Sequence, residues 1–292
     1  MREKEYLYLL SIDKPQLLRF MIKQKVMARS TYISENLTQK QIDFMLQLDD
    51  YELDIFSLAD VKKQLGDKVE DVNELIENLV HKRILSRIKR GKYCRYNFRD
   101  EQVIGSFLVQ DGAVAYWSAL HHYGLTEQFP NSIFIQTTYP KQDKSVFGVY
   151  YKFVKIRKSK RAGVVKEGYG NRSYRITSLE KTVADCFDLP QYSGGYAELI
   201  RAFNEAEMDG DKLIEACRAI HNIAATKRMG YLAELCQKRE LDGFVAYAEE
   251  QVNDKYNLFD LAGTEDGEFV SKWKIRLNIP MENIVGILNQ QY

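Results

Sequence analysis

The sequence predicts an α+β fold with two domains behind a helical N-terminal extension. Before residue 83, apolar residues recur at helical spacing, and two short strand-like runs around a glycine follow them. Beyond residue 104, strand-like alternation gives way to a series of short amphipathic helices. The length of 292 residues suits two domains of ordinary size. We therefore expect an extension over residues 1–38, a first domain over 39–103 and a second over 104–292.

The composition is typical of a folded globular protein, with 45% hydrophobic and 28% charged residues. No apolar run approaches the roughly 20 residues that a transmembrane helix needs. The first thirty residues contain Pro15 and frequent charges, which does not suit a secretory signal. We therefore expect a cytoplasmic protein without a membrane partner. The four cysteines are far apart and form no Cys-x-x-Cys pair, so the sequence supports neither a disulfide framework nor a zinc ribbon.

The first domain is predicted to contain three helices followed by a basic hairpin. One helix begins near Thr38, and Ser57 with Asp60 has the spacing of a cap for the second. The third helix has apolar residues at three- and four-residue spacing: Val69, Val72, Leu75, Ile76 and Leu79. Two short strands then flank a turn at Arg90–Gly91, where glycine supplies the positive φ.

This arrangement resembles a winged helix-turn-helix, in which the third helix enters the major groove of DNA and the hairpin contacts the backbone. Residues 81–99 carry eight Lys or Arg and no Asp or Glu. The resemblance implies that double-stranded promoter DNA is held at its phosphates by Arg87, Lys89, Arg90, Lys92 and Arg95. On the third helix, Asn73 and Asn78 are candidates for base contacts. Phosphate would repel Glu74 and Glu77 of that helix, so a winged helix that binds protein is the alternative.

The second domain is predicted to mix helices and strands and to become helical toward its C-terminal part. A helix from Tyr116 ends at Gly124, which suits a left-handed cap. A strand is expected over residues 131–135, and residues 147–153 alternate like a half-buried strand. The tail is predicted to form a strand over residues 273–277 and a helix over residues 281–289.

A capping box at Thr177–Glu180 is expected to open a further helix. Apolar positions of this helix face inward, which leaves Glu180, Lys181 and Asp185 on its outward face. Paired charges inside such a segment are also commonly structural, and this alternative stays open for Glu180 and Asp185.

Charge is segregated along the chain, although the formal net charge is +1. Residues 141–175 carry eleven basic and two acidic residues, whereas residues 241–292 carry nine acidic and four basic ones. The basic part indicates contact with an anionic partner. The candidate partner-binding residues are Lys158, Lys160, Arg161, Lys181, Lys227 and Arg228. A solvated hairpin is the alternative for the basic residues between 155 and 172.

Sequence motifs for catalysis and cofactor binding are missing. There is no Gly-x4-Gly-Lys-Ser/Thr loop, no Gly-x-Gly-x-x-Gly and no His-Glu-x-x-His. Cys217 and His221 lie one helical turn apart, but further metal ligands are not evident. Asp209 and Asp211 are placed to cap a helix rather than to bind magnesium. We therefore expect no cofactor, no metal and no enzymatic activity.

Four stretches in this order resemble the AbiEi family of antitoxins, the regulator half of bacterial abortive-infection toxin–antitoxin pairs. They are Trp117–Glu127, Ser178–Cys186, Gly194–Gly195 and Lys227–Leu232. With the tail from Trp273 to Pro280, the resemblance covers about residues 83–280. It implies an N-terminal winged helix that represses the operon and a mixed α/β antitoxin domain. It also implies a nucleotidyltransferase-like toxin as the partner.

We therefore expect a non-enzymatic antitoxin and transcriptional autoregulator of a phage-defence operon, which neutralises its cognate toxin and binds promoter DNA. Two alternatives remain. One is a stand-alone winged-helix repressor whose C-terminal domain senses a small ligand. The other is an enzyme that acts on nucleic acid.

Overall fold

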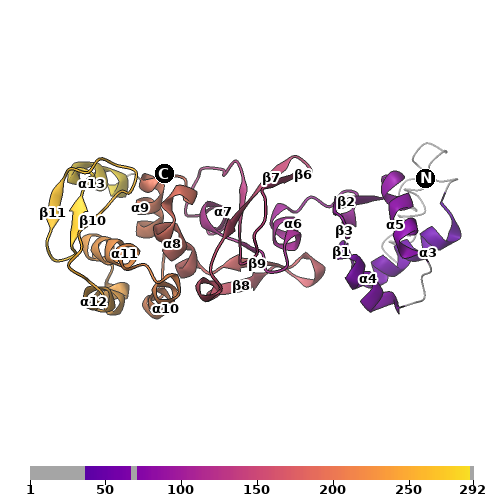
Figure 1. Ribbon diagram of the computed structural model, residues 1–292, viewed down its shortest axis with the longest axis horizontal. Helices are drawn as coiled ribbons and strands as arrows, with labels where there is room; N and C mark the ends of the chain where they lie inside the picture. Colours follow the sequence, from indigo (N-terminus) through magenta and orange to yellow (C-terminus); the bar gives the residue numbers. More distant parts are fainter. Residues whose placement is uncertain (1–36, 67–70, 290–292) are drawn as a thin grey trace, which may run out of the picture. The chain divides into compact units, whose positions relative to one another are not determined.

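The computed structural model describes residues 37–66 and 71–289. They belong to two compact units (Figure 1). The N-terminal unit extends to Phe98 and includes Gly170–Arg172, whereas the C-terminal unit consists of Arg99–Tyr169 and the chain from Ser173 onward. The helical extension predicted over residues 1–38 lies outside the described residues, except for Leu37 and Thr38.

The described residues of the N-terminal unit form three helices and a small antiparallel sheet. In chain order its elements are α3 (Gln39–Asp50), β1 (Ile55–Ser57), α4 (Leu58–Leu65), α5 (Val72–His81), β2 (Leu85–Lys89) and β3 (Lys92–Arg95). The strands pair in the order β1–β3–β2, so β1 adds a third strand to the predicted hairpin.

Local signals fix the ends of these elements. The Thr38 hydroxyl accepts from the Gln41 N–H and caps α3, and the Ser57 hydroxyl accepts from the Asp60 N–H and caps α4. Gly91 has a φ of 74°, as the predicted turn requires. The core of the unit is formed by Phe44, Leu48, Phe56, Val61, Ile76 and Leu79. Val69, which was expected on the same apolar stripe, lies outside the described residues.

A six-stranded mixed sheet lies at the centre of the C-terminal unit. Its strands are β4 (Ala113–Val114), β5 (Ile133–Thr137), β6 (Lys144–Val146), β7 (Val149–Lys155), β8 (Val164–Glu167) and β9 (Tyr174–Thr177). Their order is β6–β7–β5–β4–β9–β8, with β5–β7 and β4–β9 parallel and the other pairs antiparallel. The edge strands β6 and β8 have three and four residues.

Helices cover both faces of this sheet (Figure 1). On one face lies α6 (Glu101–Leu108), where a side chain at Gly105 would come within 2.7 Å of Ile135. On the other face, Phe134 and Val154 join the core formed with α7 (Tyr116–His122) and α8 (Leu179–Asp188). The mixture of helices and sheets confirms the predicted α+β class.

The C-terminal part of this unit is mainly helical and includes a small sheet. Its helices are α9 (Tyr196–Glu205), α10 (Gly210–Ile220), α11 (Ile223–Leu235), α12 (Asp242–Glu250) and α13 (Met281–Asn289). The small sheet pairs β10 (Asn257–Leu258), β12 (Ile275–Leu277) and β11 (Glu268–Val270) in that order. None of the helices that the structure describes is long and apolar enough to cross a membrane.

The tail strand begins two residues later than predicted, because Trp273 is a turn residue. The ring of Trp273 lies so close to Gly230 that a side chain there would come within 2.5 Å of it. Its indole N–H donates to Glu234 Oε2 at 2.7 Å. The helix predicted over residues 281–289 is confirmed as α13.

Candidate functional site

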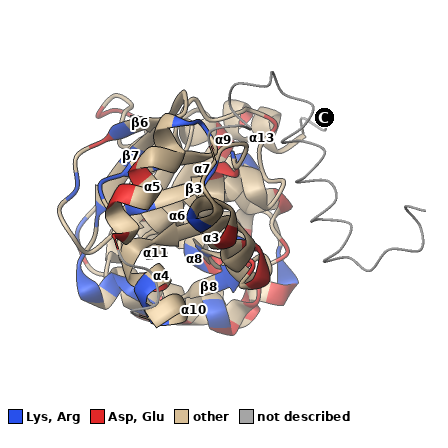
Figure 2. Cartoon of the chain, turned by 90° about the vertical axis from the view of Figure 1, so that its right-hand side faces the viewer, with Lys and Arg blue, Asp and Glu red and all other residues tan. Residues whose placement is uncertain are grey.

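The hairpin formed by β2 and β3 carries four cations, which we call the hairpin surface: Arg87, Lys89, Arg90 and Lys92. Arg87 and Arg90 are exposed, and the other two are half-buried. Lys89 and Lys92 are paired directly across the two strands beside the turn at Gly91. The positive charges therefore gather at the tip of the hairpin, and Figure 2, with Lys and Arg in blue, looks onto this unit.

Arg87 is joined to the third helix by an ion pair. Its guanidinium donates to Oε1 of Glu77 on α5, and the Tyr93 hydroxyl donates to the same oxygen at 2.9 Å. The Arg87 guanidinium also lies 5.9 Å from the centre of the Tyr93 ring. The hydrogen bond from Arg87 lowers the pKa of Glu77, so this carboxylate is ionised at neutral pH. The ion pair between Arg87 and Glu77 thus connects the hairpin surface to α5.

This ion pair makes the outward face of α5 less acidic than we expected from the sequence. Asn73, Glu74 and Asn78 are exposed on α5, as expected. Glu77 lies between them, and its charge is balanced by Arg87. Glu74, the other glutamate expected to repel phosphate, has no ion-pair partner among the residues that the structure describes.

Arg95 was expected to contact DNA, but the structure turns it inward. Its guanidinium forms an ion pair with Asp49 of α3, and the two side chains are each 17% exposed. Burial lowers the pKa of Arg95 and raises the pKa of Asp49. Arg95 therefore fixes α3 against β3 and is not part of the hairpin surface.

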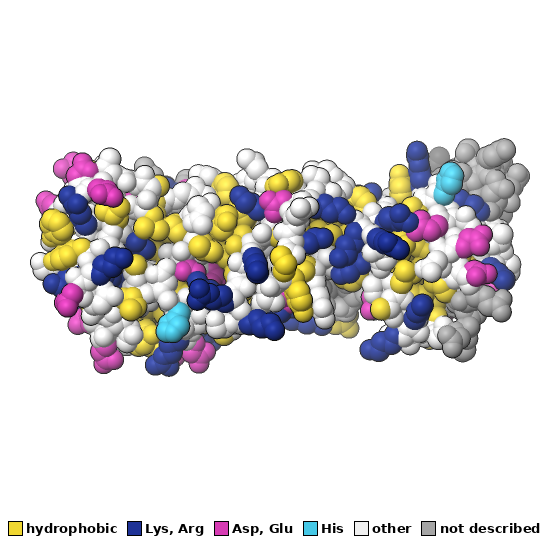
Figure 3. Space-filling model, in the orientation of Figure 1, with side chains coloured by type: hydrophobic (Ala, Val, Ile, Leu, Met, Phe, Trp, Pro, Cys, Tyr) yellow, Lys and Arg dark blue, Asp and Glu magenta, His cyan; other side chains and the backbone are white. Residues whose placement is uncertain are grey.

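The basic segment of the C-terminal unit is partly engaged in ion pairs. Lys160 pairs with Asp188 at the end of α8, and Arg161 pairs with Asp111 at 2.9 Å. Lys158 is exposed, together with the neighbouring cations Lys155 and Arg157. Figure 3, with Lys and Arg in dark blue, shows cations on one face of this unit. Of the candidates in this segment, Lys158 is the one that the structure leaves most exposed to a partner.

Lys181 was expected on an outward face, and this expectation is wrong. Lys181 is 0% exposed and forms an ion pair with Asp185, which is 2% exposed. Glu180 is also buried. Burial raises the pKa of Asp185 to about 6, even with Lys181 beside it. The helix cap is one residue later than predicted, because the Ser178 hydroxyl accepts from the Lys181 N–H.

Lys227 and Arg228 of α11 are buried as well, so neither can bind a partner from the surface. The Lys227 ammonium donates to the carbonyl of Lys255 at 2.7 Å, to Asn253 Oδ1 at 3.2 Å and to the carbonyl of Lys274 at 3.3 Å. Arg228 Nε donates to the carbonyl of Leu258 at 2.9 Å. This pair therefore fastens the small sheet and the loop before it to α11.

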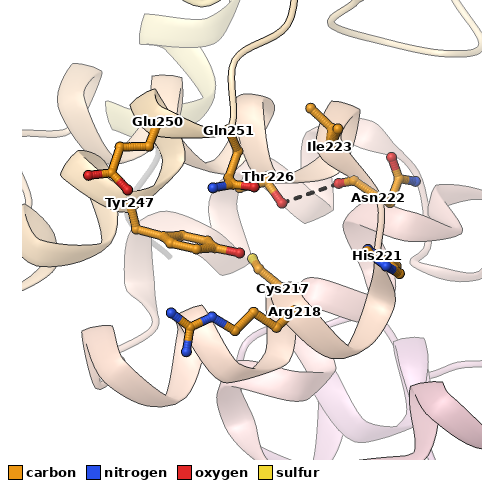
Figure 4. Close-up of a pocket in the computed structure, with 9 residues that line it drawn as sticks. All are labelled: Cys217, Arg218, His221, Asn222, Ile223, Thr226, Tyr247, Glu250 and Gln251. Carbon is orange, nitrogen blue, oxygen red and sulfur yellow. Dashed lines mark hydrogen bonds between the residues drawn. The ribbon is translucent and has the colours of Figure 1, made fainter.

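A pocket of about 370 Å³ opens between α10, α11 and α12 (Figure 4). Its lining residues are Cys217, Arg218, His221, Asn222, Ile223, Thr226, Tyr247, Glu250 and Gln251. The Tyr247 hydroxyl points toward Cys217, and the Arg218 guanidinium lies 5.3 Å from the centre of the Tyr247 ring. Burial raises the pKa of the Cys217 thiol to about 12, which makes it a poor nucleophile.

The carboxylates considered for metal binding have a structural role. Oδ1 of Asp209 accepts from the N–H groups of Asp211 and Lys212 and caps α10, as predicted. Between residues 37 and 289, leaving out 67–70, no group of three or more His, Cys, Asp or Glu side chains could hold a metal ion. Cys217 and His221 therefore lack further described ligands.

The contacts of Glu77 were not anticipated from the sequence, which presented this residue as an obstacle to DNA binding. One signal could have indicated them. Arg87 and Tyr93 lie at opposing positions of the predicted hairpin, and they are direct cross-strand partners in the structure. An acidic residue on the preceding helix is a natural partner for such a pair.

Comparisons with known proteins identify a similar fold but do not assign the chain to a family. No known family profile matches the chain, and no curated protein sequence matches it. Among solved structures, the chain is similar to the crystal structure of RV2827C protein from Mycobacterium tuberculosis, with a TM-score of 0.56 and 15% sequence identity. The similarity covers 86% of this chain and 96% of that chain. At this identity it shows a similar fold alone.

Proposed function

We propose that the N-terminal unit is a winged helix that binds double-stranded DNA in the promoter of its own operon. The observation that carries this proposal is the order of the elements α3, β1, α4, α5, β2 and β3, with the four cations of the hairpin surface on the last two strands and the turn between them. A winged helix places its hairpin against the DNA backbone and its third helix in the groove. The pairing of Glu77 with Arg87 reduces the repulsion between α5 and phosphate.

The C-terminal unit is, in this proposal, a non-enzymatic antitoxin that neutralises a nucleotidyltransferase-like toxin in the cytoplasm. This part rests on the resemblance of four sequence stretches to AbiEi antitoxins. A separate core supports it, because buried residues from α7 to α13 form one cluster within the unit. Lys155, Arg157 and Lys158 offer an exposed basic surface to an anionic partner.

A triple substitution in the hairpin surface tests the DNA proposal. Changing Lys89, Arg90 and Lys92 to Ala should weaken binding to specific and random duplexes alike and should reduce the dependence of affinity on salt. A matched control removes three cations from the C-terminal unit, at Lys155, Arg157 and Lys158, and should leave DNA affinity much less changed. Binding curves that the first triple substitution does not alter would exclude the hairpin surface as the DNA contact.

The antitoxin proposal is tested by coexpression with the product of the neighbouring gene. If that gene encodes a nucleotidyltransferase-like toxin, residues 99–292 should restore growth without the N-terminal unit. The triple substitution at Lys155, Arg157 and Lys158 should weaken rescue if this basic surface contacts the toxin. A folded fragment that fails to rescue, while the full chain succeeds, contradicts a separable antitoxin unit.

The pocket between α10, α11 and α12 favours one other function, a repressor that releases DNA on binding a small polar ligand. Its lining offers Arg218, Glu250 and Gln251 beside the ring of Tyr247, which are groups that can orient such a ligand. Screening metabolites for those that raise the melting temperature separates the two functions. A ligand that stabilises the wild-type chain but not Arg218→Ala, and that weakens DNA binding, would favour the repressor.

A further inference from the structure

Glu77 lies on the outward side of α5, where it is partly exposed and the residues around it on that side, Asn73, Glu74, Asn78 and His81, are exposed. Asn73 precedes it by four residues and His81 follows it by four, so the three side chains are neighbours along one helical stripe. Asn73 and His81 are exposed, and the side chain of Glu77 is 43% exposed. A helix that lies in the major groove with this stripe toward the bases would bring Glu77 to the floor of the groove.

The carboxylate of Glu77 is held in a fixed orientation. The Tyr93 hydroxyl and the Arg87 guanidinium both donate to Oε1, and Tyr93 is itself buried on β3 at 3% exposure. Among the residues that the structure describes, no donor contacts Oε2. One oxygen is therefore used for positioning, and the other keeps its capacity to accept a hydrogen bond.

We propose that Glu77 is a specificity-determining residue, whose Oε2 accepts a hydrogen bond from the exocyclic amine of a cytosine in the major groove. This inference rests on the proposed DNA binding. A carboxylate accepts from the cytosine amine, whereas the keto oxygens of guanine and thymine at the groove edge would repel it. Arg87 supplies the balancing charge that allows a carboxylate to approach the phosphates, so the negative charge that was expected to oppose DNA binding contributes selectivity instead.

The experiment selects preferred sites from a pool of random-sequence duplexes with the full-length protein. The wild-type chain should enrich a motif with cytosine at a defined position. Glu77→Gln keeps the shape of the side chain but replaces one acceptor with a donor, and its discrimination at that position should fall by about tenfold. Tyr93→Phe removes the positioning hydroxyl and should reduce the same preference less strongly. Melting curves verify that each variant is folded.

Glu74→Gln is the matched control, because it removes the same charge from the same helix at a residue with no described charge partner. It should leave the selected motif unchanged. If Glu77→Gln also leaves the motif unchanged, or raises affinity for every duplex by the same factor, Glu77 does not read a base. A wild-type chain that binds duplexes without any motif overturns this inference but not DNA binding. A wild-type chain that binds no duplex overturns the proposed DNA binding itself.

Discussion

Two ion pairs of the molecule differ in their exposure to solvent: one joins α5 to strand β2, and the other lies within α8. Glu77 of α5 and Arg87 are 43% and 47% exposed, whereas Lys181 and Asp185 of α8 are 0% and 2% exposed. The difference comes from the neighbours of each helix. Helix α5 packs one face against its sheet and core, whereas α8 is contacted by α7, α9, α10 and α11. The surroundings of a helix therefore decide whether its charged side chains stay accessible at the surface or are buried within the fold.

The two ion pairs are also expected to differ in how much they contribute to the free energy of unfolding. An exposed pair is screened by water and contributes little to stability, so its members can be used for binding. A buried pair has already lost its hydration, and removing one member leaves the other without compensation. The following predictions test this contrast, beginning with the largest expected effect.

Breaking the buried pair should destabilise the C-terminal unit strongly. Lys181→Met or Asp185→Leu alone should each lower the free energy of unfolding by about 3–5 kcal/mol, because one buried charge stays unpaired. The double substitution should cost much less than the sum of the two. Chemical denaturation of the four proteins in a double-mutant cycle measures this coupling. Additive losses would mean that the pair does not act as a unit.

A smaller effect on stability is expected from Lys227. Burial lowers the pKa of its ammonium group from 10.5 to about 8. Between these values the unfolded chain holds the proton and the folded chain does not. The free energy of unfolding should therefore rise with pH in this window, by at most about 1.4 kcal/mol per pH unit from this group. Lys227→Met removes this contribution. Parallel stability curves for the two proteins between pH 8 and 10 would contradict the lowered pKa.

The smallest effect on stability is expected at the exposed pair. Arg87→Ala should change the free energy of unfolding by less than about 1 kcal/mol, because water screens the interaction with Glu77. The same substitution should weaken DNA binding measurably if the hairpin surface contacts phosphates. A stability loss as large as that of Lys181→Met would remove the contrast between the two helices.

The parts of the fold that were predicted correctly depend on local signals. The cap at Ser57, the apolar stripe through Ile76 and Leu79, and the turn at Gly91 each involve residues within a few positions of one another. Strand β1 was missed because it has three residues, and its pairing with β3 joins Ile55 to Cys94 across the unit. A strand of that length has no periodicity of its own.

The candidate site was predicted less well, for a related reason. Arg87, Lys89, Arg90 and Lys92 lie on the hairpin as expected. Lys227 and Arg228 looked like surface charges, but their acceptors are the side chain of Asn253 and backbone carbonyls that lie between 28 and 47 residues further along the chain. Sequence spacing does not indicate such partners. Thr177 looked like the helix cap, although it ends β9 and its hydroxyl contacts Thr182.

The edges of the large sheet in the C-terminal unit limit how another protein can attach to it. Strand β6 has three residues and includes Lys144, and β8 has four and includes Lys166 and Glu167. Short, charged edges oppose pairing with a strand from another chain, which protects the sheet against aggregation. A protein partner of this unit is thus expected to recognise side chains. Substitutions in β6 or β8 that alter the backbone hydrogen bonding of these edge strands should change its binding little.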